Sequence, residues 1–190
     1  MDGKKQIERN VVVEATPGAV WAVLADSKLL PRWAPIVDEV TACAAGGEGV
    51  GEVRHCTARL AGRTGRMVER CVEFAPHRRI AYVVDEESFG MRRMFDDYGF
   101  ALDLEPAPAG GTRVTLQTHY SPRNALYAVL NATVMRRRFA AACEDLLAGL
   151  KSFTESCPPS DAAPSSTARR RAQNACLKCD APSELKPRSA

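Results

Sequence analysis

The sequence lacks the motifs by which most enzymes are recognised. It has no glycine-rich phosphate-binding loop, no G-x-S-x-G nucleophile elbow and no Ser–His–Asp signature. Its three histidines, His55, His77 and His119, do not stand at ligand spacing from one another or from a cysteine, so we expect no metal site in the body of the chain. We expect no cofactor either. Any reaction would therefore be acid–base chemistry on a bound molecule.

Long apolar runs and an excess of charge are also missing. No stretch reaches the ~18 apolar residues of a membrane span, and the N-terminal MDGKKQIERN has no apolar signal-peptide core. Residues 1–155 hold 20 Lys and Arg against 20 Asp and Glu, so the net charge of +3 lies in the last 35 residues. A neutral body argues against nucleic-acid binding, and we predict no stable membrane insertion.

The cysteines are odd in number, scattered, and often at apolar positions, as is typical of buried reduced thiols. They are Cys43, Cys56, Cys71, Cys143, Cys157, Cys176 and Cys179. This usage predicts a cytoplasmic, reducing location. Cys176 and Cys179 form only half of a zinc site, and the sequence assigns them no role.

What the sequence does contain is a series of segments whose apolar residues recur at strand spacing or at helix spacing. A strand ending in VVVEA precedes a helix over 17–25, where Thr16 is the expected N-cap and Pro17 the first helical residue. A short helix over 28–33 follows, and then six alternating segments separated by turn residues. These segments are expected at 37–44, 49–60, 65–74, 79–86, 92–104 and 112–120. A long amphipathic helix over 123–153, with a bend or restart near Asn131, closes the pattern.

This order predicts an α+β protein in which a curved antiparallel seven-stranded sheet (β-α-α-β6-α) wraps around the C-terminal helix and leaves a cavity. The first domain covers residues 1–155. Residues 156–190 contain no glycine and no aromatic residue but five of the twelve prolines. A segment with so little apolar area cannot offset its ordering entropy, so a disordered, basic tail is predicted there.

The stretch VVVEATPGAVWAVLADSKLLPRWAPIVDEV resembles the opening of the START/polyketide-cyclase (SRPBCC) superfamily, also called the helix-grip fold. FAPHRRIAY, GGTRVTL and the closing LLAGLKSFTE add to the resemblance, which covers residues 5–155 and is nearest to bacterial polyketide cyclase/dehydrase-type proteins. The resemblance implies a hydrophobic cavity and, at one of its ends, Trp33. Trp33 would either stack on a ligand or plug the core.

Strand alternation indicates which side chains face the cavity. Arg70 is expected to point inward with Val68 and Val72, and Asp96 to point inward with Tyr98. Two opposite charges in an apolar concavity would form a pair that orients a polar group or moves protons, with Tyr82 as a third candidate catalytic residue. The alternatives are a bulge that turns Arg70 or Asp96 out to solvent, or a pair that lies at the rim of the sheet.

The other expected ligand contacts come from the same faces and from the start of the long helix. The full set of predicted ligand-binding residues is Trp33, Arg54, Cys56, Arg70, Tyr82, Met94, Asp96, Tyr98, Thr118, Tyr120, Asn131 and Met135. Phe89 and Met91, at a hairpin tip, would form a lid or touch a membrane transiently, or else fold back on the sheet edge.

Three functions remain open at this stage. The first is a binding module for a small hydrophobic or amphipathic molecule, lipid-like or polyketide-like. The second is an aromatase/cyclase-type enzyme, as the resemblance implies. The third is a protein–protein interaction module whose cavity is filled by side chains.

Overall fold

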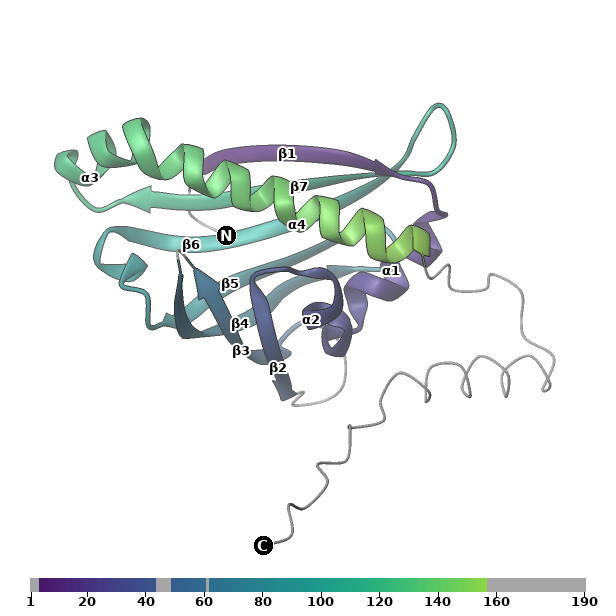
Figure 1. Ribbon diagram of the computed structural model, residues 1–190, viewed down its shortest axis with the longest axis horizontal. Coiled ribbons are helices and arrows are strands. Elements are labelled where there is room, and N and C mark those ends of the chain that lie inside the picture. The colour runs from purple at the N-terminus through teal and green to yellow at the C-terminus, as the bar shows by residue number, and fades with distance from the viewer. Residues whose placement is uncertain (1–3, 44–48, 61, 157–190) are drawn as a thin grey trace, which may run out of the picture. The chain divides into compact units, whose positions relative to one another are not determined.

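The computed structural model describes residues 4–43, 49–60 and 62–156. Its seven strands form one curved antiparallel sheet in the order β1-β7-β6-β5-β4-β3-β2 (Figure 1). The strands are β1 (Lys5–Val13), β2 (Val37–Cys43), β3 (Val53–Leu60), β4 (Arg63–Ala75), β5 (Arg79–Glu87), β6 (Phe95–Pro106) and β7 (Thr112–Pro122). The strands that follow the first helices form a meander, and β1 pairs with β7, so both ends of the domain meet at one side of the sheet.

Short helices connect β1 to β2. They are α1 (Pro17–Ala25), the 3-10 turn η1 (Ser27–Leu29) and the single turn α2 (Leu30–Trp33). The side chain of Thr16 accepts a hydrogen bond from the backbone N–H of Ala19, which confirms the predicted cap. A second 3-10 turn, η2 (Met91–Arg93), occupies the start of the strand predicted from residue 92, so β6 begins three residues later than expected.

The C-terminal helix consists of α3 (Ala125–Leu130), the π-helical turn η3 (Asn131–Met135) and α4 (Arg136–Ser156). The π turn lies where the change of apolar face predicted a bend or restart. In Figure 1, α4 lies along the concave face of the sheet and α3 extends from its far end. Phe139, Cys143, Leu147 and Leu150 form its buried stripe.

The predicted helix-grip architecture is confirmed. The predicted tail lies outside the described residues apart from Ser156, which is the last residue of α4. Among the helices of the described residues, none has the length and apolarity needed to cross a membrane.

Candidate functional site

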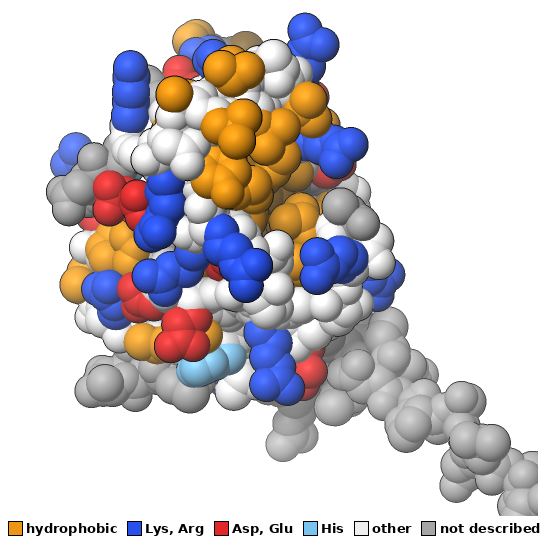
Figure 2. Space-filling model, turned by 90° about the vertical axis from the view of Figure 1, so that its left-hand side faces the viewer, with side chains coloured by type: hydrophobic (Ala, Val, Ile, Leu, Met, Phe, Trp, Pro, Cys, Tyr) orange, Lys and Arg blue, Asp and Glu red, His pale blue; other side chains and the backbone are white. Residues whose placement is uncertain are grey.

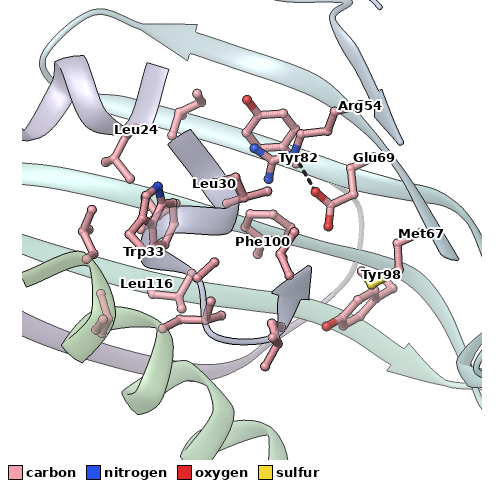
Figure 3. A pocket seen from close by; sticks show the side chains of 18 residues that line it. Leu24, Leu30, Trp33, Arg54, Met67, Glu69, Tyr82, Tyr98, Phe100 and Leu116 are labelled. Atoms are coloured by element: carbon pink, nitrogen blue, oxygen red, sulfur yellow. Dashed lines mark hydrogen bonds and ion pairs between the residues drawn. The ribbon is translucent and has the colours of Figure 1, made fainter. Parts of the chain in front are cut away.

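A cavity of about 110 Å3 lies between α2, α4 and the inner face of the sheet. Most of its wall is aliphatic, and Figure 3 shows leucines from α1, α2 and the strands turned into the same space as Trp33 and Phe100. The lining residues are Leu24, Leu30, Trp33, Ala34, Ile36, Val37, Arg54, Met67, Glu69, Ile80, Tyr82, Tyr98, Phe100, Leu102, Leu116, Leu146, Leu147 and Leu150. Such a wall favours an apolar occupant.

One end of the cavity carries a buried ion pair. Nε of Arg54 on β3 donates a 2.6 Å hydrogen bond to Oε2 of Glu69 on β4, and both side chains are nearly inaccessible to solvent (Figure 3). The two residues are direct cross-strand partners, so they share the inner face. The Arg54 guanidinium lies 3.7 Å from the centre of the Tyr82 ring, a cation–π contact.

The Arg54 guanidinium is positively charged at neutral pH. Burial is the largest single influence and lowers the pKa of this guanidinium, but the charge of Glu69, the electrostatic contributions of Tyr82 and Cys56 and the hydrogen bond to Glu69 together outweigh it, so the net direction is upward. Burial, followed by the Glu69 charge, raises the pKa of the neighbouring Cys56 thiol to about 12. Burial likewise raises the pKa of Tyr82 to about 12. At neutral pH the cavity end therefore offers a cation and protonated donors.

The hydrogen-bond donors at this end are incompletely used. Within the described part of the chain, the only hydrogen bond donated by Arg54 comes from Nε, so both Nη groups are without a protein acceptor. The indole Nε1 of Trp33 is buried and also has no acceptor among those residues. Buried donors normally find partners, so these unpaired donors are available to an acceptor in the cavity.

Behind the cavity wall lies a second buried carboxylate. Oε1 of Glu52 accepts a 2.7 Å hydrogen bond from the hydroxyl of Ser27, and Glu52 is only 3% exposed. Ser27 also lowers the pKa of Tyr82, although less than burial raises it. Ser27 and Glu52 do not line the cavity, and they support its polar end from outside.

The prediction that Arg70 and Asp96 form an ion pair is wrong. Arg70 makes a bidentate ion pair with Asp85, and Asp96 pairs with Arg123, all on the outer surface. Regular alternation from Met67 to Val72 places Met67, Glu69 and Cys71 inward and Val68, Arg70 and Val72 outward, and the register shift between Cys71 and Glu73 returns Phe74 to the inner face. In β6 a bulge at Asp97, whose φ is 55°, reverses the alternation, so Phe95 points inward and Asp96 outward. Arg70 and Asp96 line one groove on the outer surface while Tyr82 lines the cavity, so the three candidate catalytic residues are not brought together.

The remaining predicted contacts divide into two groups. Trp33, Arg54, Tyr82 and Tyr98 line the cavity. The others do not: Cys56 and Thr118 are buried beside it, Met94 and Met135 are half-buried against the core, and the Tyr120 hydroxyl donates a 2.8 Å hydrogen bond to Oδ1 of buried Asn131.

Tyr120 belongs to an aromatic cluster that fills the other end of the space under the helix. Phe95, Tyr98, Tyr120 and Phe139 have ring centres 4.8 to 6.4 Å apart. This packing leaves the cavity confined to the end near α2. The predicted ligand set was too long because it extended into this closed region.

Phe89 and Met91 fold back on the molecule. Met91 is 5% exposed, Phe89 packs against the core, and neither lines the cavity. A methyl group added at Gly65 would approach the Phe89 ring to 2.7 Å, so Phe89 lies directly over β4. The structure therefore has the arrangement that the sequence left open as the alternative to a lid.

The fold and its enclosed cavity define a helix-grip protein of the START/SRPBCC superfamily. The chain belongs to the family described as polyketide cyclase/dehydrase and lipid transport, whose model matches residues 4–155. Comparison with curated proteins finds no match.

Solved structures with the same fold share little sequence with this chain. A START superfamily protein from Mycobacterium smegmatis has 13% identity and a TM-score of 0.65, with 80% of this chain and 99% of that chain covered. Zhui aromatase/cyclase from Streptomyces sp. R1128 has 20% identity and a TM-score of 0.63, covering 81% and 95%. Ginseng major latex-like protein 151 from Panax ginseng has 11% identity and a TM-score of 0.66, covering 80% and 97%.

Proposed function

We propose that the protein binds a small, mostly apolar molecule that carries one hydrogen-bond-accepting oxygen, a carbonyl or hydroxyl of the kind found in polyketides and lipids. The observation that carries this proposal is the buried Arg54, whose Nη groups have no acceptor among the described residues at the end of an otherwise aliphatic cavity. The family description, which includes both polyketide cyclisation and lipid transport, agrees with an occupant of this class.

The charge balance of the site favours a neutral ligand over an anion. Glu69 already neutralises Arg54, so an added carboxylate would be a third charge in a buried site, next to Glu69 itself. A carbonyl oxygen would satisfy the Nη donors without adding charge. An analogue that lacks the oxygen leaves these donors unpaired, and this is how a hydrogen-bonding site rejects such a compound.

The volume of the cavity limits the ligand. Its 110 Å3 is below the ~150 Å3 of an engineered apolar cavity that takes up benzene, and well below the ~300 Å3 at which ligand pockets usually begin. As it stands, the cavity accepts a small ring or a short chain. A lipid or a polycyclic polyketide would require the wall to move outward.

A matched pair of probes tests the proposal. Pentan-2-one and pentane share one short carbon chain and differ in the carbonyl oxygen, so we expect pentan-2-one to bind at least tenfold tighter in an NMR titration. Leu146 lines the cavity on α4 and Ala148 is exposed on the same helix. Leu146→Trp should therefore abolish binding, and Ala148→Trp should leave it unchanged. Equal affinity for the two probes would refute the role of Arg54.

Native mass spectrometry of the protein purified from its own cells would identify the natural occupant. A reproducible extra mass, absent from the denatured spectrum and lost in Leu146→Trp, supports the proposal. No extra mass together with no binding of either probe would favour an interaction module with a filled cavity.

Catalysis by an aromatase/cyclase-type reaction is the second candidate, and one observation favours it. Glu69 is the carboxylate that lines the cavity, beside Arg54, in an arrangement where it would accept a proton from a ligand held at the Nη groups. Tyr82, with its pKa raised to about 12, would serve only as a donor at neutral pH. Conversion of the bound molecule by the native protein, lost in Glu69→Gln with the ligand still bound, would establish this reaction.

A further inference from the structure

The start of the C-terminal helix presents apolar side chains to solvent. No residue of α3 is buried, and Leu126 and Val129 are 73% and 62% exposed. Leu130 and Val134 are also exposed. Val129 and Leu130 stand three and four residues after Leu126, and Val134 stands four residues after Leu130, so all four side chains lie on one side of the helix. Figure 2, which faces this end of the molecule, shows hydrophobic side chains gathered in one patch with Lys and Arg around its edge. We call these four residues the α3 patch.

The α3 patch is held in this position by specific contacts. Asn124 caps α3 by accepting a hydrogen bond from the backbone N–H of Tyr127. The buried Asn131 is tied to Tyr120 on β7, and the Thr133 hydroxyl bonds back to the carbonyl of Val129. The exposure is therefore part of the folded arrangement. A contiguous exposed apolar patch of this kind marks a surface that meets an apolar partner.

The surroundings of the α3 patch are basic. Asp and Glu are absent from residues 106–143. A hydrogen bond from the Arg123 N–H to the Met94 carbonyl joins the start of α3 to the end of η2, so both elements contribute cations. The arginines at this end are Arg92, Arg93, Arg123, Arg136, Arg137 and Arg138. The acidic residues beside them are fewer: Glu8, Asp85, which is paired with Arg70, Glu87, which accepts a hydrogen bond from the Arg92 backbone N–H, Asp96, which is paired with Arg123, and Asp97.

We propose that the α3 patch docks the protein on the surface of an anionic lipid bilayer, with Leu126 and Val129 inserted below the headgroups and the arginines against them. Aliphatic side chains with a basic border are the pattern of a helix that lies in the membrane interface. Each basic residue near an anionic surface adds its own attraction, so a small apolar patch is sufficient.

Charge and size argue against protein partners. In a symmetric dimer the patch would meet its own copy, which would bring the arginine border of one protomer against that of the other. Four aliphatic side chains on a short helix also offer much less area than the ~800 Å2 per partner of a standard protein interface. A bilayer presents no facing arginines and does not need a contact area of that size.

Vesicle flotation of the full-length protein tests the proposal. Binding to vesicles of phosphatidylcholine with 30% phosphatidylglycerol is expected at low salt, and binding to pure phosphatidylcholine is expected to be at least tenfold weaker. The double variant Leu126→Ser/Val129→Ser should reduce binding to the anionic vesicles at least tenfold. Val50, which is 69% exposed and far from this helix in the sequence, provides the matched control Val50→Ser, which should bind like the original chain.

Two further outcomes would point to the basic tail, or to a second copy of the chain, in place of docking through the α3 patch. If Leu126→Ser/Val129→Ser floats as well as the original chain, the tail or another surface binds the lipid and the proposal fails. If the original chain does not float, and its mass in solution rises with concentration in a way that the double variant abolishes, the α3 patch is a dimer interface and the proposal also fails. Flotation does not depend on the cavity, so it is independent of the proposed ligand.

Discussion

Replacing Arg54 with methionine tests whether Arg54 and Glu69 form a buried ion pair in which each charge depends on the other. Methionine keeps much of the arginine stem but leaves the Glu69 carboxylate buried without its cation. Removing one partner of a buried pair typically costs about 3–5 kcal/mol, to which the lost contact with the Tyr82 ring contributes. For a domain of this size, ~4 kcal/mol corresponds to a fall in Tm of about 8–16 °C.

The double variant Arg54→Met/Glu69→Leu separates stability from function. Removing both charges should restore the free energy of unfolding to within about 1–2 kcal/mol of the original, because apolar replacements of buried pairs are often neutral. If the pair exists to hold a ligand oxygen, the restored protein should bind pentan-2-one and pentane equally. Urea denaturation followed by tryptophan fluorescence gives both free energies.

The pH dependence of the single variant provides a check. In Arg54→Met the carboxyl of Glu69 is buried without its cation, and burial favours the protonated form of a carboxyl over the charged form. The deficit relative to the original protein should then shrink as the pH falls. A loss below about 1 kcal/mol at pH 7, with no pH dependence, would refute the description of a buried and mutually dependent pair.

Three further predictions concern the packing and ionisation of the core. A methyl group at Gly149 would lie 2.1 Å from the backbone carbonyl oxygen of Trp33, so Gly149→Ala should destabilise by about 2–3 kcal/mol in urea, whereas Ser152→Ala on the exposed side of the same helix should not. Tyr120→Phe leaves the buried amide oxygen of Asn131 without its donor, which should cost about 1–3 kcal/mol and speed amide hydrogen exchange in α3; unchanged exchange would show that this bond does not hold the helix. Burial raises the pKa values of the buried thiols and of Tyr120 to about 11 or 12, so in the folded protein these groups keep protons that the unfolded chain has lost. The free energy of unfolding should therefore fall as the pH rises from about 9 towards 12. A flat profile measured by urea denaturation would contradict this burial.

The order of elements was predictable because it depends on local signals. The cap at Thr16, the change of apolar face near Asn131 and the alternation of β3 each involve residues close together in the chain. Arg54 was placed on the inner face correctly because β3 has no bulge within its pairing to β4. The confinement of the cavity to one end was not predictable, since it depends on how four aromatic rings from three elements, β6, β7 and α4, fill the other end.

The partner of Arg54 was within reach of the sequence, although alternation along β4 gave the wrong residue. β3 and β4 pair without a register shift from the Leu60–Arg63 end, so Arg54, six residues before Leu60, lies opposite Glu69, six residues after Arg63. Direct cross-strand partners share a face, so an inward Arg54 requires an inward Glu69 and an outward Arg70. The apolar residues Val68 and Val72 suggested instead that their own face, with Arg70, is the inner one. They lie on the outer face because valine there is tolerated more readily than an unpaired buried charge. For a hairpin with a short turn, the register counted from the turn is therefore better evidence for a buried ion pair than the hydrophobicity of either strand.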